Sequence, residues 1–298
     1  NEFSLYHAER TFRRVSSIPI VPCLGSVQDS ELLKHLLHDH QINTVYHAAA
    51  YKHVPLVEEN PLEGLRNNAL GTRTLVEKCI EAEVSSFVLI STDKAVRPTN
   101  VMGASKRIAE LIVQDTARRF PERKLGIVRF GNVLDSSGSV VPLFREQIKK
   151  RSPITVTHPE ITRYFMSIGE AARLVIQAGA MSKNGEVFLL DMGQPVKIKD
   201  LALQMIELSG LVPEKDIPLQ YTGLRPGEKL YEELLIDPAQ SQPTLHPRIF
   251  CSEEPLPEVK VLEKEISILK EAIEQRDISN ALASMKRLVP EYNSENGQ

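Results

Sequence analysis

The sequence predicts an α/β protein with a doubly wound parallel sheet and a smaller C-terminal substrate-binding domain. Short apolar runs rich in β-branched residues alternate with longer segments of helical periodicity through the first half of the chain, which is the pattern of repeated βαβ units. The run Phe87–Ile90 is apolar at every position, as expected for a strand that helices cover on both faces. With 298 residues, 42% of them hydrophobic, the chain is long enough for one large domain and a smaller one.

The first half contains four expected strands and three expected helices. The expected strands are Ile18–Cys23, Thr44–His47, Phe87–Ser91 and Leu125–Phe130. The expected helices are Asp29–Leu37, Pro61–Glu83 and Val101–Arg118, and the second of these has Pro61 at a plausible first-turn position. We therefore assign residues 1–150 to one α/β domain.

The pattern changes after residue 150, where the elements are shorter and proline is more frequent. Expected strands are Thr155–Thr157 and Glu186–Leu190, and expected helices are Ile168–Met181, Ile198–Leu208, Lys260–Gln275 and Ile278–Leu288. Asn293–Gln298 is expected to be a frayed tail. We assign residues 151–298 mainly to a substrate-binding domain with two terminal helices.

Charge and composition exclude several classes of function. The formal net charge is -3 and the pI is about 6.3, so no general basic field would attract nucleic acid or an anionic membrane. The three cysteines, Cys23, Cys79 and Cys251, are scattered, as in a reducing compartment. No apolar run approaches the roughly 18 residues that cross a bilayer. We predict a cytoplasmic portion without membrane contact and, because His53 has no second ligand at suitable spacing, no metal site.

The residues best suited to chemistry lie between Thr92 and Lys106. Thr92, Asp93 and Lys94 follow the buried strand, at the edge where open parallel sheets bind ligands. Met102 and Lys106 are one helical turn apart at the start of the next helix, so they share a face. The alternative interpretation is a salt-bridged loop at Asp93 and Lys94, with Met102 filling the core.

Five ordered motifs resemble the polysaccharide-biosynthesis branch of the extended short-chain dehydrogenase/reductase superfamily, which has a Rossmann-like fold. The resemblance is strongest to UDP-N-acetylglucosamine 4,6-dehydratases and covers essentially the whole chain. The motifs are His47–Pro55, Ser91–Arg107, Arg129–Asp135, Pro159–Met166 and Gly223–Lys229. Each alone would be weak evidence, whereas all five in order at compatible spacing are strong evidence.

The resemblance implies a lyase in which Met102 replaces the usual catalytic tyrosine. A thioether has no proton to exchange, so Asp93 and Lys94 take over the proton transfers. Lys94 would handle the C5 proton of the sugar, and a protonated Asp93 would donate to the departing C6 hydroxyl. Thr92 would hydrogen-bond the C4 oxygen, and Lys106 would anchor the nicotinamide ribose. The methionine variant resembles the dehydratases that retain configuration at C5.

The resemblance implies NAD as a tightly bound cofactor, regenerated in each turnover, in preference to NADP. The implied cofactor contacts are Ser26, Val27, Ala48, Ala49, Ala50 and Lys106, although Ser26 stands where the family has an acidic residue. None of the 15 glycines forms the Gly-x-x-Gly-x-x-Gly turn that cradles the pyrophosphate. Asn1–Tyr6 resembles the segment after the family's second strand, so we expect the first βαβ portion to be missing and residues 1–150 to form a partial dinucleotide-binding Rossmann domain. The alternative is a member that has abandoned NAD.

The resemblance also assigns the UDP-sugar contacts. Arg163 and Arg225 match diphosphate-binding positions, for which the planar guanidinium is well suited. The remaining implied contacts are Asn132 to the nucleotide sugar, Thr155 and Val156 to uracil, Glu228 to ribose, and Lys52 and His53 near the sugar. The two helices Pro61–Glu83 and Val101–Arg118 imply a homo-oligomer. The parent chain of such proteins often has a membrane anchor in the inner membrane, which this sequence leaves open.

Two other functions remain open from the sequence. A UDP-sugar 4-epimerase has the same fold, but it needs no acid for C6 and typically keeps the tyrosine that Met102 replaces. A non-catalytic nucleotide-sugar-binding module would explain the missing glycine-rich turn.

Overall fold

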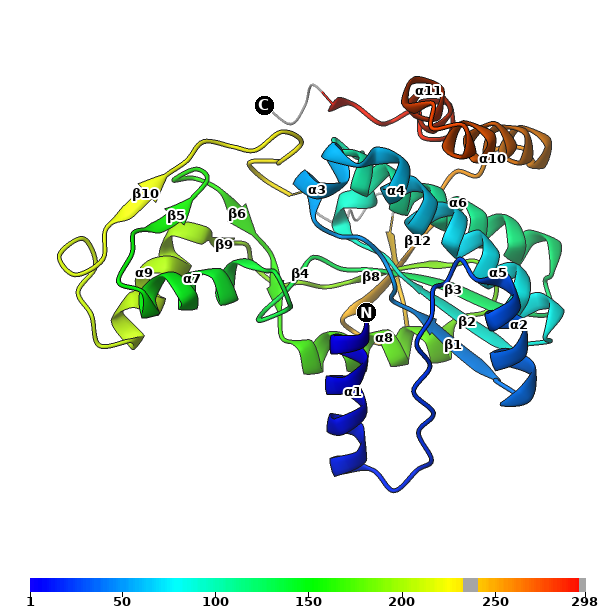
Figure 1. The fold of residues 1–298 in the computed structure, drawn as a ribbon, viewed down its shortest axis with the longest axis horizontal. Coiled ribbons are helices and arrows are strands. Elements are labelled where there is room, and N and C mark those ends of the chain that lie inside the picture. Colours follow the sequence, from blue (N-terminus) through cyan, green and yellow to red (C-terminus); the bar gives the residue numbers. More distant parts are fainter. Residues whose placement is uncertain (233–240, 295–298) are drawn as a thin grey trace.

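A six-stranded sheet forms the centre of the molecule (Figure 1), and the computed structural model describes residues 1–232 and 241–294. The strand order is β1-β2-β3-β8-β12-β11. The strands are β1 Thr44–His47, β2 Ser86–Ile90, β3 Lys124–Arg129, β8 Val187–Leu190, β12 Ile249–Ser252 and β11 Ser241–Pro243. The first four are parallel, and β12 and β11 add an antiparallel edge. The predicted α/β class with a Rossmann-like, mainly parallel sheet is confirmed, while the antiparallel edge was not predicted.

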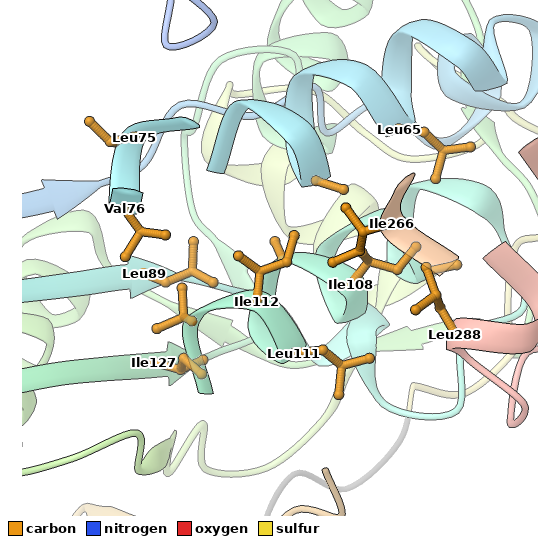
Figure 2. Packing of buried hydrophobic residues seen from close by; sticks show 14 of the residues in the cluster. Leu65, Leu75, Val76, Leu89, Ile108, Leu111, Ile112, Ile127, Ile266 and Leu288 are labelled. Atoms are coloured by element: carbon orange, nitrogen blue, oxygen red, sulfur yellow. The ribbon is translucent and has the colours of Figure 1, made fainter. Parts of the chain in front are cut away.

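Helices cover both faces of this sheet because alternate residues of its strands are apolar on both sides. Phe87 and Leu89 of β2 point into a core shared with α6 Val101–Arg119 and α5 Gly71–Glu81 (Figure 2). Val88 between them points into a second core, where α8 Ile168–Met181 packs. All three strand residues are fully buried, as expected for a strand inside a doubly wound sheet.

The three helices predicted before β3 are present, but α3 was not predicted and the middle helix is interrupted. They are α2 Ser30–Asp39, α3 Val54–Glu59, α4 Pro61–Leu65, the π-helical turn η1 Arg66–Leu70, then α5 and α6. The predicted helix Pro61–Glu83 is thus interrupted by η1. Single π turns inside helices occur frequently at functional sites, and here the turn directs the buried side chain of Asn68 toward the loop after β1.

A smaller lobe lies beside the carboxyl ends of the parallel strands and has its own apolar core (Figure 1). Its elements are α7 Val140–Lys149, β5 Ile154–Val156, β6 Thr162–Arg163, β9 Val196–Lys197, α9 Ile198–Leu208 and β10 Leu219–Tyr221. Two short strands, β4 Asn132–Val133 and β7 Phe165–Met166, pair with each other where the chain crosses between the two parts. The sequence predicted α9 and, shifted by one residue, β5, but it did not predict the other short strands β4, β6, β7, β9 and β10.

The two predicted terminal helices, α10 Val259–Glu274 and α11 Ile278–Leu288, pack against the helical layer at η1, α4 and α6. Nearly every residue of α6 is buried within the single chain, so α6 offers no free face to a second copy. The expected homo-oligomer stays a prediction. The expected tail begins at Asn293, whose backbone N–H donates to Pro98 O at 3.0 Å, whereas residues 295–298 lie outside the described part.

The prediction of a strand at Ile18–Cys23 is wrong. This segment has no regular structure and no ladder partner in the described part of the chain. Pro19 and Pro22 remove two of its backbone donors, and Ile18 and Val21 are largely exposed. The helix α1 Glu2–Val15, which precedes it, was not predicted and contains no buried residue. Among the described residues, none of the helices combines the length and apolarity needed to span a bilayer.

Candidate active site

A cavity of about 840 Å³ opens between the carboxyl ends of the parallel strands and the smaller lobe, a position typical of ligand sites in open α/β sheets. Most of the predicted site residues line it. They are Ala48, Ala50, Lys52, His53, Thr92, Lys94, Met102, Lys106, Asn132, Thr155, Val156, Arg163, Arg225 and Glu228. The fold therefore brings together five motifs that are separated by up to 180 residues in the sequence.

Four predicted residues do not line this cavity. Asp93 lies directly behind the lining, with 2% of its surface exposed, and Ala49 lies between two lining residues. Ser26 and Val27 form the turn before α2, where the Ser26 hydroxyl accepts a hydrogen bond from the Gln28 N–H at 3.2 Å. Val27 packs against the main core.

The turn after β2 is held in place by its own side chains and by β3. Asp93 N–H donates to Phe130 O at 3.1 Å, which continues the pairing of the two strands. Thr92 caps the short 3₁₀ turn η2 Asp93–Ala95, and its hydroxyl donates to Asp93 Oδ1 at 2.9 Å. The carboxyl of Asp93 and the side chain of Lys94 are consequently fixed beside each other at the rear of the cavity.

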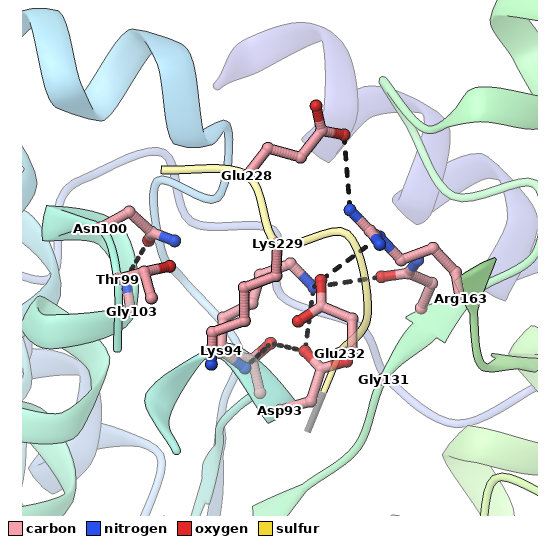
Figure 3. A network of polar contacts seen from close by, with 12 residues as sticks. Asp93, Lys94, Thr99, Asn100, Gly103, Gly131, Arg163, Glu228, Lys229 and Glu232 are labelled. Carbon is pink, nitrogen blue, oxygen red and sulfur yellow. Dashed lines mark hydrogen bonds and ion pairs between the residues drawn. The ribbon is translucent and has the colours of Figure 1, made fainter. Parts of the chain in front are cut away.

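Lys94 lies between two buried carboxylates (Figure 3). Its Nζ is 3.0 Å from Asp93 Oδ1 and 3.0 Å from Glu232 Oε1. Burial alone would lower the pKa of Lys94, but the two carboxylates offset it and raise that pKa to about 12. Burial raises the pKa of Asp93, although Lys94 opposes the shift. A carboxyl group that resists ionisation next to a lysine can serve as an acid and base pair.

Glu232 was not predicted from the sequence. Its side chain is buried, and besides Lys94 it contacts Arg163 Nε at 3.3 Å. Burial would raise the pKa of Glu232, but Lys94 and Arg163 lower it, so the carboxylate is charged. Its other oxygen has no hydrogen-bond partner and neither has Asp93 Oδ2, although both are buried. Nothing in the local pattern around Glu232 signalled this role, since only folding brings it to Lys94.

The start of α6 carries Met102 and Lys106 into the same cavity, as predicted from their spacing. The Lys106 side chain is 4% exposed, and burial lowers its pKa to about 8. Among the described residues its ammonium has no hydrogen bond or ion pair, and the side chain lines the cavity. An ammonium that has three donors and no protein acceptor suits a ligand with hydroxyl or phosphate oxygens at this point.

One helical turn further along α6, Glu110 forms the centre of a buried ionic network. Arg129 donates to its two oxygens at 2.8 and 2.6 Å, Arg107 donates at 3.1 Å, and the Ser91 hydroxyl donates at 2.5 Å. Burial would raise the pKa of Glu110, but the two arginines lower it to about 2. This network ties the end of β2, directly before Thr92, to the helix that carries Lys106.

A second buried contact holds the loop after β1. The amide of Asn68 in η1 accepts from Tyr51 N–H at 2.8 Å and donates to Tyr51 O and to Ser105 Oγ, both at 2.9 Å. It thereby fixes the loop that carries Ala48, Ala50 and Lys52 to α6. The sequence signal for this contact was absent, because an asparagine inside a helical pattern gives no indication of a π turn.

The predicted phosphate-binding residues face the cavity from the smaller lobe. Arg163 is buried and contacts Glu228 at 3.4 Å in addition to Glu232 (Figure 3). The backbone N–H of Arg225 donates to Glu228 Oε2 at 3.1 Å. On the opposite wall, His53 packs closely on Gly138, where an added Cβ would lie 2.4 Å from the imidazole ring.

The residues present fit one part of a nicotinamide nucleotide. The small side chains of Ala48 and Ala50 allow close approach at the end of β1, and the unpaired ammonium of Lys106 suits ribose hydroxyls. The glycine-rich turn for the pyrophosphate is not among the 298 residues. The described residues likewise contain no group of three or more side chains arranged to hold a metal ion.

Comparison with known proteins agrees with this arrangement. A family model described as "Polysaccharide biosynthesis protein" matches residues 1–254. The chain belongs to this family. It is 55% identical over 236 residues to the capsular polysaccharide biosynthesis protein CapD of Staphylococcus aureus, covering 78% of this chain and 39% of CapD. It thus spans well under half the length of that relative. It is 36% identical over 214 residues to the UDP-glucose 4-epimerase of Rickettsia canadensis, covering 71% of this chain and 61% of that enzyme.

Solved structures support the fold. The chain superposes on Pen from Bacillus thuringiensis with a TM-score of 0.77 and 33% identity, covering 86% of this chain and 78% of Pen. It superposes on DesIV, a dTDP-glucose 4,6-dehydratase from Streptomyces venezuelae solved with NAD, with a TM-score of 0.67 and 20% identity, covering 76% and 74%. The family and the Rossmann-like fold are thereby confirmed.

Proposed function

We propose that this protein catalyses the NAD-dependent 4,6-dehydration of UDP-N-acetylglucosamine to a UDP-4-keto-6-deoxy-N-acetylhexosamine for the synthesis of a bacterial glycan. The observation that carries the proposal is the buried pair of Asp93 and Lys94 beside a helix on which Met102 takes the place of a hydroxyl-bearing side chain. Such a site has an acid and a base for eliminating water, but lacks the phenol that hydride transfer alone would use.

The Asp93–Lys94 contact can supply both groups in one step. In the open site Lys94 is protonated, because its pKa is about 12. Moving that proton along the 3.0 Å contact to Asp93 creates a neutral amine and a neutral carboxylic acid together. A bound sugar that excludes water favours this uncharged form, since desolvation penalises charges. The amine can then remove the C5 proton, and the acid can protonate the departing C6 hydroxyl.

Bound NAD would supply the hydride acceptor for sugar C4 and the hydride donor for C6. Lys106 would hold its nicotinamide ribose, and Thr92 would orient the C4 oxygen. Arg163 and Arg225 would bind the diphosphate, and Glu228 the ribose of UDP. Thr155 and Val156 would bind uracil through the backbone, while Asn132, Lys52 and His53 would surround the sugar. The position of these residues around one cavity supports each assignment.

The proposal is tested by NMR of UDP-N-acetylglucosamine incubated with NAD and the purified protein in D₂O. We expect a new 6-methyl signal and deuterium at C5, because the proton removed at C5 exchanges with solvent. The measurement should compare the 298-residue chain with the longest polypeptide that its gene encodes. An unchanged substrate with both would contradict the proposal and favour a nucleotide-sugar-binding module.

A second candidate is a UDP-sugar 4-epimerase, favoured by the similarity to the UDP-glucose 4-epimerase of Rickettsia canadensis. An epimerase would invert C4 and leave C6 hydroxylated, so the same NMR experiment would show a galacto isomer without a methyl signal. The buried pair of Asp93 and Lys94 argues against this candidate, because epimerisation expels no hydroxyl group and so needs no acid to protonate one.

A further inference from the structure

The segment before α6 and the loop at Gly227 are joined by a pair of side-chain contacts. The hydroxyl of Thr99 and the amide nitrogen of Asn100 both donate to the carbonyl oxygen of Gly227, each at 3.1 Å. Lys229 extends the junction, because its Nζ donates to Arg97 O at 3.1 Å and to Val96 O at 3.3 Å. More than 120 residues separate the two segments in the sequence.

Asn100 uses the two ends of its amide for different partners. Its Oδ1 accepts from the Gly103 N–H at 2.8 Å and so caps the first turn of α6. Its Nδ2 makes the contact to Gly227. The side chain is buried, with 4% exposed. One planar group therefore fixes both the start of the helix that carries Lys106 and the loop that carries Arg225.

The close approach depends on glycine at residue 227. Its φ is +73°, a left-handed conformation that favours glycine. An added Cβ would also lie 2.8 Å from the Cβ of Asn100, nearer than ordinary side-chain carbons approach. Both the backbone angle and the available space thus match the contact with Asn100.

We infer that Asn100 is a positioning residue that sets the distance between the nucleotide-binding loop and the reacting groups. It acts through Gly227 and not on the sugar itself. The loop beyond Gly227 leads directly to Glu228, and through it to Arg163, which Glu228 contacts at 3.4 Å. The identity of the nucleotide rests on the proposed function, whereas the mechanical link rests on the contacts alone.

Asn100→Asp tests the inference with little change in shape. A carboxylate still accepts from Gly103 N–H and suits a helix N-terminus, but it cannot donate to Gly227 O and repels it. Thr99→Val removes the second donor without adding charge, and Thr99→Ser, which keeps the hydroxyl, is its matched control. Thermal unfolding followed by circular dichroism shows which variants keep the fold.

Two measurements then test whether Asn100 positions the loop. We expect hydrogen exchange in residues 223–230 to be about tenfold faster in Asn100→Asp and Thr99→Val, since a lost hydrogen bond to a partly buried carbonyl is worth about one decade. We expect UDP to bind about tenfold more weakly to these variants, with Thr99→Ser close to wild type. If Asn100→Asp fails to fold, the Thr99 pair decides alone.

Unchanged hydrogen exchange in residues 223–230 of folded variants would show that Thr99 and Asn100 do not hold this loop. Faster exchange with unchanged UDP affinity would overturn the positioning role and leave a purely structural contact. A wild-type protein that does not bind UDP would instead contradict the proposed substrate, and the exchange data would still decide whether Asn100 holds the loop.

Discussion

Replacing Glu110 with glutamine removes the fully buried carboxylate that accepts hydrogen bonds from both Arg107 and Arg129. The pKa of Glu110 is lowered from 4.5 to about 2. At about 1.4 kcal/mol per pKa unit, this corresponds to roughly 3 kcal/mol of folding stability. Both guanidinium groups keep an ion pair with Glu254, and Arg107 also keeps one with Glu291, so neither is left without a counter-charge. We expect Glu110→Gln to lose about 3 kcal/mol of folding stability at pH 7.

The folding stability that Glu110 contributes should depend on pH. Because the folded-state pKa of Glu110 lies below that of the unfolded chain, its contribution is complete above about pH 4.5 and is lost as the pH falls toward 2. The difference in unfolding free energy between wild type and Glu110→Gln should therefore narrow by about 1 kcal/mol from pH 7 to pH 4.

The assay is urea unfolding followed by circular dichroism, since the chain has no tryptophan. Glu160→Gln is the matched control, because Glu160 pairs with Lys197 at 2.7 Å on the exposed surface, and we expect no measurable change there. The prediction would be refuted if Glu110→Gln were as stable as Glu160→Gln at pH 7. It would also be refuted if the difference in unfolding free energy between wild type and Glu110→Gln did not change with pH.

Three further predictions concern the reacting groups. Asp93→Asn keeps the shape but has no proton to give, so we expect formation of the 6-methyl product to fall at least about 100-fold by NMR; near-normal turnover would exclude Asp93 as the acid. Glu232→Gln removes a negative charge 3.3 Å from Arg163, so UDP should bind more tightly by calorimetry, and weaker binding would contradict competition for Arg163. The pKa of Lys106 is about 8, so its positive charge is lost as the pH rises through 8. Calorimetry should show NAD affinity falling between pH 7 and 9, and Lys106→Met should abolish that dependence; a wild-type affinity independent of pH would contradict the assignment.

Periodicity predicted the long elements well because their burial follows a regular repeat. Helices α8 and α9 have the predicted bounds, and β2 differs from its prediction by one residue at each end. Periodicity failed at Ile18–Cys23, where β-branched residues suggest a strand but two prolines remove backbone donors and no strand within residues 1–232 or 241–294 pairs with the segment. Local pattern cannot reveal the presence of a partner strand.

The site was predicted where its residues form motifs and missed where they act singly. Thr92, Lys94 and Lys106 belong to one continuous stretch that ends a strand and opens a helix, so topology alone places them together. Glu232 and Glu110 stand in ordinary helical or loop sequence. Their roles depend on buried partners brought from distant segments, and a single sequence does not indicate such pairings.

The contacts of the reacting groups divide into two sets with different consequences. On the sheet side, the turn at Asp93 is joined to β3 through the backbone and to α6 through Ser91 and Glu110, all deeply buried. On the lobe side, Lys94 and the start of α6 meet Glu232 and Gly227, which belong to the loop that would hold the nucleotide. Changes on the first side should lower the folding stability, because they remove partners of buried charged groups. Changes on the second side should alter nucleotide affinity while the core remains intact. The pair Glu110→Gln and Asn100→Asp separates these effects, since both variants keep the size of the side chain and differ in which set of contacts they break.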